Sequence, residues 1–93
     1  MRIPSAGVPT LSVFYGIVIK MFFDDHDPPH LHVEYAGQEA KVGLAGGELM
    51  RGVIPPRALR LVREWIVLHR DELEENWRLA KAMQPVRRVE PLP

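Results

Sequence analysis

The first half of the chain has the two-residue period of β-strands. In residues 12–23 (SVFYGIVIKMFF), β-branched and aromatic residues dominate and every odd position is apolar, which favours a strand with one buried face. These odd positions are Val13, Tyr15, Ile17, Ile19, Met21 and Phe23. The even positions Phe14, Val18 and Phe22 lie on the other face, where we expect an exposed apolar stripe that marks a partner surface.

Shorter segments continue the strand pattern. Residues 30–35 (HLHVEY) and residues 38–44 (QEAKVGL) alternate apolar with polar positions. Gly46-Gly47 separates the second segment from residues 48–54 (ELMRGVI), and such glycine pairs are typical of hairpin turns. The sequence therefore predicts an antiparallel meander with one apolar face. The other face carries His30, His32, Glu34 and Lys41.

The second half has the period of helices. In residues 57–83 apolar positions recur at spacings of three to five, which indicates an amphipathic helix. A single helix of this span would be about 40 Å long, so we expect a bend at residues 69–72, where Asp71 is the candidate N-cap. Trp65 and Trp77 are the expected core anchors.

Together these elements predict an α+β fold, with an antiparallel sheet of three to four strands packed on one face by a bent C-terminal helical segment. Residues 1–10 are rich in proline, glycine and serine, and we expect a flexible N-terminal segment there. Residues 11–93 are long enough for a single α+β domain. The apolar run 11–23 is too short to cross a bilayer and contains Lys20, so we expect a cytoplasmic protein without membrane contact.

Composition excludes several classes of function. The chain has no cysteine, which removes disulfides, thiolate metal sites and a cysteine nucleophile. Its 12 basic and 12 acidic residues give a formal net charge of zero, which argues against a dedicated nucleic-acid-binding protein. Arg57, Arg60, Arg63 and Arg70 share part of a helical face and leave nucleic acid open as a partner. A solvated face with ion pairs to neighbouring acids is the favoured interpretation.

Candidate chemistry is concentrated in the stretch DDHDPPHLH. His30 and His32 lie two apart on a predicted strand, so both rings point to one face. They can share a divalent metal such as zinc, with His26 as the third ligand. Asp25 and Asp27 are candidates for orienting the rings or acting as a base, and His30 is a further catalytic candidate. The alternative is a stiff Asp-Pro-Pro turn whose histidines pair with nearby acids.

Two stretches resemble a known family. The segment PTLSVFYGIVIKMFFDDHDPPHLHVEY, followed by IPPRALRLVREWIVLHRDELEENW, is similar to the small prokaryotic family called domain of unknown function 4160. The resemblance runs from about Pro9 to Leu92. It implies no catalytic residue, but it implies a neighbouring gene for another small domain, as in a toxin–antitoxin cassette. Family members typically begin Met-Pro-Thr where this chain has Val8-Pro9-Thr10, so we expect residues 1–7 to be a dispensable extension.

Three functions therefore stay open. The first is a non-enzymatic interaction module, one half of a toxin–antitoxin-like pair, which binds the protein encoded next to it or forms a homodimer. The second is a metal-dependent hydrolase or nuclease that uses the His26/His30/His32 cluster. The third is metal-free acid–base cleavage of RNA by a histidine, with arginines holding phosphate. Metal content separates the second function from the other two.

Overall fold

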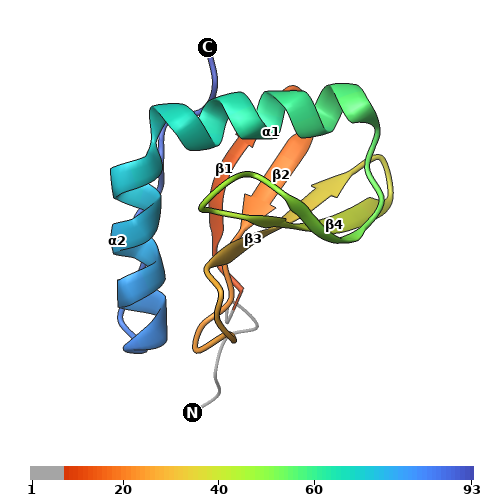
Figure 1. The fold of residues 1–93 in the computed structure, drawn as a ribbon. Helices are drawn as coiled ribbons and strands as arrows, with labels where there is room; N and C mark the ends of the chain where they lie inside the picture. The colour runs from red at the N-terminus through yellow and green to blue at the C-terminus, as the bar shows by residue number, and fades with distance from the viewer. Residues whose placement is uncertain (1–7) are drawn as a thin grey trace.

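The computed structural model describes residues 8–93 and contains an antiparallel sheet followed by two helices (Figure 1). The strands are β1 (Thr10–Phe14), β2 (Ile17–Lys20), β3 (His30–Tyr35), β4 (Gln38–Gly43) and β5 (Leu49–Gly52), and they pair in sequence order. The helices are α1 (Pro56–Leu68) and α2 (Arg70–Lys81). The α+β class is confirmed, but the sheet has five strands and not three to four. The expectation for residues 1–7 lies outside the described residues.

The extra strand comes from residues 12–23, which the pattern predicted as one strand. Tyr15 and Gly16 have positive φ angles of 52° and 80°, and two successive positive φ angles form the tight turn of a β-hairpin. Phe14 therefore pairs with Ile17 across the turn. Because the chain reverses here, the alternation of apolar positions does not continue from β1 into β2.

The predicted exposed stripe is wrong for the same reason. Phe14 is 5% exposed, and its ring centroid lies 5.4 Å from that of Trp65 in the core. Val18 is partly buried in β2. Phe22 follows β2 and stacks on the ring of His32, with centroids 3.8 Å apart. These three positions do not form one surface.

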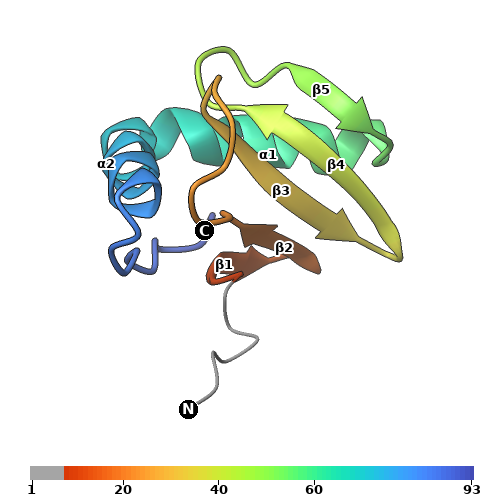
Figure 2. The same ribbon diagram turned by 90° about the horizontal axis from the view of Figure 1, so that it is seen from below.

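The core lies between one face of the sheet and the helices. Figure 2 shows α1 behind the sheet, so the sheet has a second face that points away from α1. The largest fully buried side chains include Leu11, Ile17, Ile19, Leu31 and Val33 from the strands and Trp65, Ile66 and Leu73 from the helices. Helix α1 packs on this face, while Trp77 of α2 contacts the ring of His30 beside the sheet, with centroids 5.3 Å apart.

The helical half bends where the sequence predicts. Between α1 and α2, His69 adopts φ −121° and ψ 25°, which interrupts the helix, and α2 then runs along the side of the sheet (Figure 1). The predicted cap is wrong: the N-cap of α2 is His69, and Asp71 lies inside the first turn. Trp65 and Trp77 are both buried. Within residues 8–93, neither helix combines the length and the apolar character that a membrane span requires.

The residues after α2 cover the outer edge of β1. The Val89 amide donates to the Leu11 carbonyl at 2.9 Å. The side-chain amide of buried Asn76 donates to the Arg87 carbonyl and accepts from the Arg87 amide, both at 2.9 Å. One edge of the sheet is therefore occupied by the chain itself, while β5 forms the other edge.

Candidate metal centre

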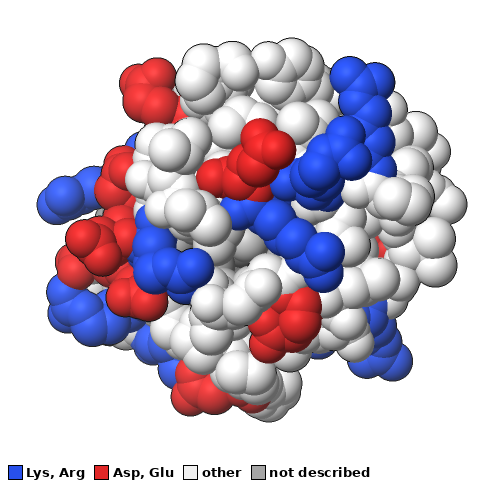
Figure 3. Space-filling view, turned by 45° about the horizontal axis from the view of Figure 1, so that its top comes forward, with Lys and Arg blue, Asp and Glu red and all other residues white. Residues whose placement is uncertain are grey.

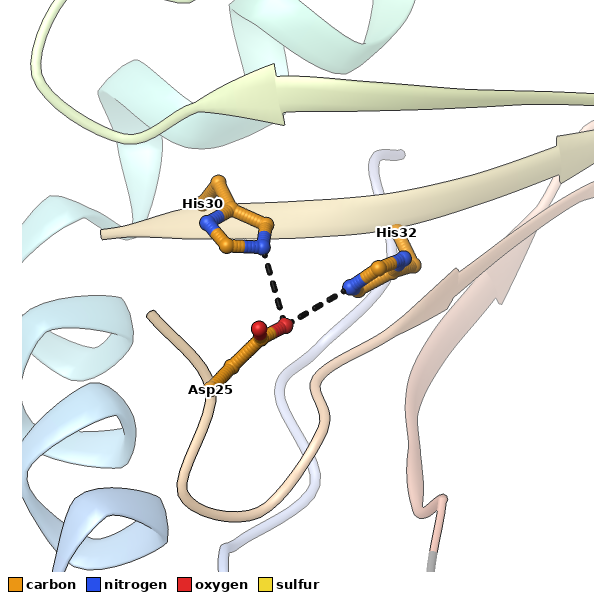
Figure 4. A group of neighbouring side chains, drawn as sticks. All are labelled: Asp25, His30 and His32. Atoms are coloured by element: carbon orange, nitrogen blue, oxygen red, sulfur yellow. Dashed lines mark hydrogen bonds and ion pairs between the residues drawn. The ribbon is translucent and has the colours of Figure 1, made fainter. Parts of the chain in front are cut away.

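Three of the predicted site residues converge at the start of β3. Oδ2 of Asp25 lies 2.9 Å from Nε2 of His30 and 3.0 Å from Nε2 of His32 (Figure 4). One potential ligand atom from each residue lies within 4.8 Å of the other two. The side chain of His26 is exposed and is not part of this group. The structure thus brings together two of the three predicted histidines, and Asp25 joins them.

The ring of His30 is fixed by a contact with Trp77 and by polar contacts at both ring nitrogens. The residue is 2% exposed, and its ring centroid lies 5.3 Å from that of Trp77. Nδ1 of His30 lies 2.8 Å from the Pro28 carbonyl oxygen. Because a carbonyl can only accept, Nδ1 carries a proton and donates. The other nitrogen, Nε2, is thereby directed at Asp25.

His32 is the more open member of the group. Its ring stacks on Phe22 with an interplanar angle of 13°, which fixes the ring plane. The side chain of His32 is 20% exposed and that of Asp25 is 14% exposed, against 2% for His30. The group is therefore closed on the side of His30 and reaches solvent on the side of Asp25 and His32.

The C-terminal end of α2 positions the loop that carries Asp25. The Asp24 amide donates to the Ala80 carbonyl at 3.0 Å. The Lys81 ammonium donates to the Asp25 carbonyl at 2.8 Å. These contacts join residues more than fifty positions apart, so the place of Asp25 is set by tertiary packing and not by the local turn.

Asp27 has a different neighbour from Asp25. Its Oδ1 accepts a hydrogen bond from Nε1 of Trp77 at 3.1 Å, and Asp27 is not in the group of three ligand atoms. Trp77, expected only as a core anchor, thus contacts both the His30 ring and the loop before it. The helical spacing of Trp77 predicts that its side chain is buried. It does not predict which loop the side chain contacts.

The charge of Asp25 is stabilised in this environment. Burial raises the pKa of the Asp25 carboxyl, but hydrogen bonds from His32 and the His26 amide, with the charge and hydrogen bond of His30, lower it by more, to about 2. Asp25 is therefore ionised at neutral pH, and both Nε2 atoms face a negative oxygen.

Two arrangements of charge satisfy these contacts. In the first, Nε2 of each histidine carries a proton and donates to Oδ2 of Asp25. In the second, a divalent cation replaces these protons, and His30 keeps its Nδ1 proton on the Pro28 carbonyl. A backbone carbonyl that accepts from the second ring nitrogen is the usual support of a metal-binding histidine. Ligands about 2.0 Å from zinc lie about 3.3 Å apart in a tetrahedron. Here Oδ2 of Asp25 lies 2.9 and 3.0 Å from the two Nε2 atoms, and all three atoms lie within 4.8 Å of one another.

An open hollow adjoins this group on the sheet face that points away from α1. Its volume is about 720 Å³, within the range of small-ligand sites. The lining includes Lys20, Phe22, His32, Glu34, Lys41 and Arg51. Because His32 belongs both to the hollow and to the group with Asp25, a ligand in the hollow lies beside the candidate metal position.

The helical arginines are partly used for structure. Nε of Arg63 donates to the Gly47 carbonyl at 2.7 Å. Arg70 donates to the carbonyls of Leu44 and Ala45 at 2.7 and 2.9 Å. These bonds tie the loop between β4 and β5 to the helices. On the face shown in Figure 3, acidic side chains lie among the basic ones, which supports a solvated helical surface over a phosphate-binding one.

The comparison with protein families agrees with the resemblance seen in the sequence. Residues 16–78, more than half of the 93 residues, match the family described as Domain of unknown function (DUF4160). The chain therefore belongs to the DUF4160 family. No match was found among the curated proteins or among the solved structures.

Proposed function

We propose that this DUF4160 domain binds a divalent metal ion between Asp25, His30 and His32 and uses it to catalyse hydrolysis. The observation that carries the proposal is the convergence of Nε2 of His30, Nε2 of His32 and Oδ2 of Asp25 within 4.8 Å. Two imidazoles and one carboxylate are a ligand set that zinc and other divalent ions accept.

The chemistry follows from the number of protein ligands. Three ligands leave a coordination position for water, and a bound divalent ion lowers the pKa of that water. In the reaction, the water oxygen bonds to the electrophilic atom of the substrate, the bond to the leaving group breaks, and a water proton ends on the leaving group. His32 and Asp25 border solvent, which supports substrate access from their side.

Metal analysis of untagged protein tests the proposal. We expect about one zinc or other divalent ion per chain, measured by mass spectrometry after dialysis against micromolar metal. Asp25→Ala and His32→Ala lose the ion, because each removes one ligand. His26→Ala is the matched control, since His26 is a neighbouring histidine whose exposed side chain lies outside the group. Circular dichroism checks that each variant is folded.

Two outcomes would contradict the metal centre. Wild-type protein that stays metal-free at micromolar zinc would leave the cluster as a hydrogen-bonded support for the loop. Loss of metal in His26→Ala, with retention in His32→Ala, would place the ligands elsewhere. Hydrolysis that is equally fast in wild type and in Asp25→Ala would show that the metal ion does not take part in catalysis.

A second candidate function is an interaction module that pairs with a neighbouring gene product through β5. All four residues of β5 are exposed, and one side of the strand has no partner strand within residues 8–93. Leu49 and Met50 are 42% and 36% exposed, and the adjoining Val53 is 63% exposed. An edge strand with apolar side chains is the surface to which a partner strand adds.

Co-purification with the adjacent gene product tests this second candidate. We expect Leu49→Lys and Met50→Lys to abolish the complex, because lysine on an edge strand opposes pairing. Leu68→Lys is the control, as Leu68 is a comparably exposed apolar residue (61%) at the end of α1. A complex that survives both β5 substitutions, or that is lost only with Leu68→Lys, would exclude β5 as the binding edge.

A further inference from the structure

We propose that the hollow on the open face of the sheet binds a phosphate ester of nucleotide size, with Lys41 and Arg51 as its phosphate-binding residues. The proposal rests on the proposed function, since it names the substrate class of the same site. Neither residue is part of the candidate metal centre.

The strand register places these cations in one row. Lys20 pairs with His32, His32 pairs with Lys41, and Lys41 pairs with Arg51 across β2, β3, β4 and β5. Directly paired residues of an antiparallel sheet share a face, so all four side chains lie on the face that points away from α1. Neighbouring strands are about 4.8 Å apart, which lets Lys41 and Arg51 contact one phosphate group together.

The charges along this row are not equally compensated. The Lys20 ammonium lies 3.0 Å from the Glu34 carboxylate. Within residues 8–93, no acidic group lies at ion-pair distance from Lys41 or Arg51. Glu39 pairs with Glu34 in the next row of the sheet, and both carboxylates also line the hollow. The uncompensated positive charge thus lies at the β4–β5 end of the row that contains His32.

Size and shape favour a nucleotide over a bare anion. The hollow has a volume of about 720 Å³, far more than one phosphate group requires. Phe22 lines it and is 37% exposed, while one of its faces stacks on His32. An aromatic side chain beside cations is the usual combination for stacking a base while its phosphate is neutralised.

The reaction proposed for a phosphate ester in this hollow is transfer of its phosphoryl group to water. The water oxygen forms a bond to phosphorus, the bond between phosphorus and the leaving ester oxygen breaks, and a proton from water ends on that oxygen. Lys41 and Arg51 neutralise the non-bridging oxygens, on which negative charge is concentrated. His32, which lines the hollow and also contacts Asp25, places the phosphorus near the candidate metal position.

Binding is measured without metal, so that it does not depend on the proposed metal centre. The probe is a fluorescein-labelled single-stranded trithymidylate in EDTA, followed by anisotropy, with thymidine monophosphate as unlabelled competitor. We expect Lys41→Gln/Arg51→Gln to weaken binding at least tenfold. We also expect the slope of log K against log salt to fall by about 0.7, because the two residues share one phosphate group on a single strand.

The matched control is Arg57→Gln/Arg60→Gln, which removes the same charge from exposed positions on α1, away from the hollow. Its affinity stays within twofold of wild type. A methylphosphonate trithymidylate, which lacks the phosphate charges, does not bind. Tighter binding of the trinucleotide than of the monophosphate assigns a nucleic-acid strand, and equal binding assigns a free nucleotide.

The result is separable from that of the metal analysis. No saturable binding by wild type, or equal loss in both double variants, overturns the phosphate site even if zinc binds stoichiometrically. Saturable binding that depends on Lys41 and Arg51 supports the phosphate site even if wild type holds no metal, in which case the hydrolase proposal fails alone. Lys41→Gln/Arg51→Gln keeps its metal, because neither residue is a ligand.

Discussion

The hydrogen bond between Trp77 and Asp27 distinguishes a structural role of Asp27 from a role as the catalytic base. Trp77→Phe removes the Nε1 donor of this 3.1 Å bond and reduces a buried ring. We expect it to lower the free energy of unfolding by about 2–3 kcal/mol, of which about 1 kcal/mol is the hydrogen bond and the rest is the smaller ring. Asp27→Ala removes only the acceptor and costs about 1 kcal/mol, because Asp27 is exposed and water replaces part of the bond.

Urea unfolding of the two single variants and the double variant, followed by circular dichroism, measures the coupling. If the bond exists, the double variant loses about 1 kcal/mol less than the sum of the single losses. Simple additivity would refute it. Asp27→Asn is the sharper functional control, since an asparagine Oδ1 still accepts from Trp77. We expect stability and hydrolysis close to wild type, whereas lost hydrolysis at wild-type stability would make Asp27 the base.

Three further predictions concern the backbone and the charge of the site. Gly52→Ala lowers stability by about 2–4 kcal/mol in urea, because Gly52 has φ +83° and an added Cβ would overlap β4. Gly37→Ala, at φ +81° with nothing within 4 Å, costs clearly less, and equal losses would contradict the overlap. Asn76→Ala costs about 1–3 kcal/mol by thermal unfolding, because it removes the two hydrogen bonds that the buried Asn76 side chain makes with the backbone of Arg87; an unchanged melting temperature would show that the tail is not held there. In metal-free protein, Asp25 contributes about 2 kcal/mol above its ordinary pKa of 3.8, and this is lost as the pH falls towards its folded pKa of about 2. The stability of Asp25→Asn, measured as the pH is lowered, should not show this loss. A pH dependence of stability identical to that of wild type would refute the stabilising role of the Asp25 charge.

The strands after residue 29 and the helices could be predicted because their signals are local. Alternation identified β3 and β4, Gly46-Gly47 marked the turn before β5, and helical spacing marked α1. The hairpin at Tyr15-Gly16 was missed because both flanking segments are apolar and β-branched, so the pattern continues through the turn. The isolated glycine inside a strand pattern was the available signal.

The candidate site could be predicted only in part for a related reason. His30 and His32 share a face because a strand repeats every two residues. The choice between Asp25 and His26 depends on contacts of the loop with Ala80 and Lys81. Those contacts form only when α2 packs beside the loop, and no local pattern encodes them.

The covered edge of β1 has a consequence for self-association. The residues around Val89 occupy that edge, which leaves β5 as the edge available for pairing within the described residues. Edge-to-edge growth of a sheet into a filament requires two free edges on each molecule. If two copies pair through β5, the free edge of each is filled, so the expected product is a closed dimer. The backbone bond of Val89 to Leu11 thus opposes strand addition at β1 and leaves β5 as the accessible edge of the described residues.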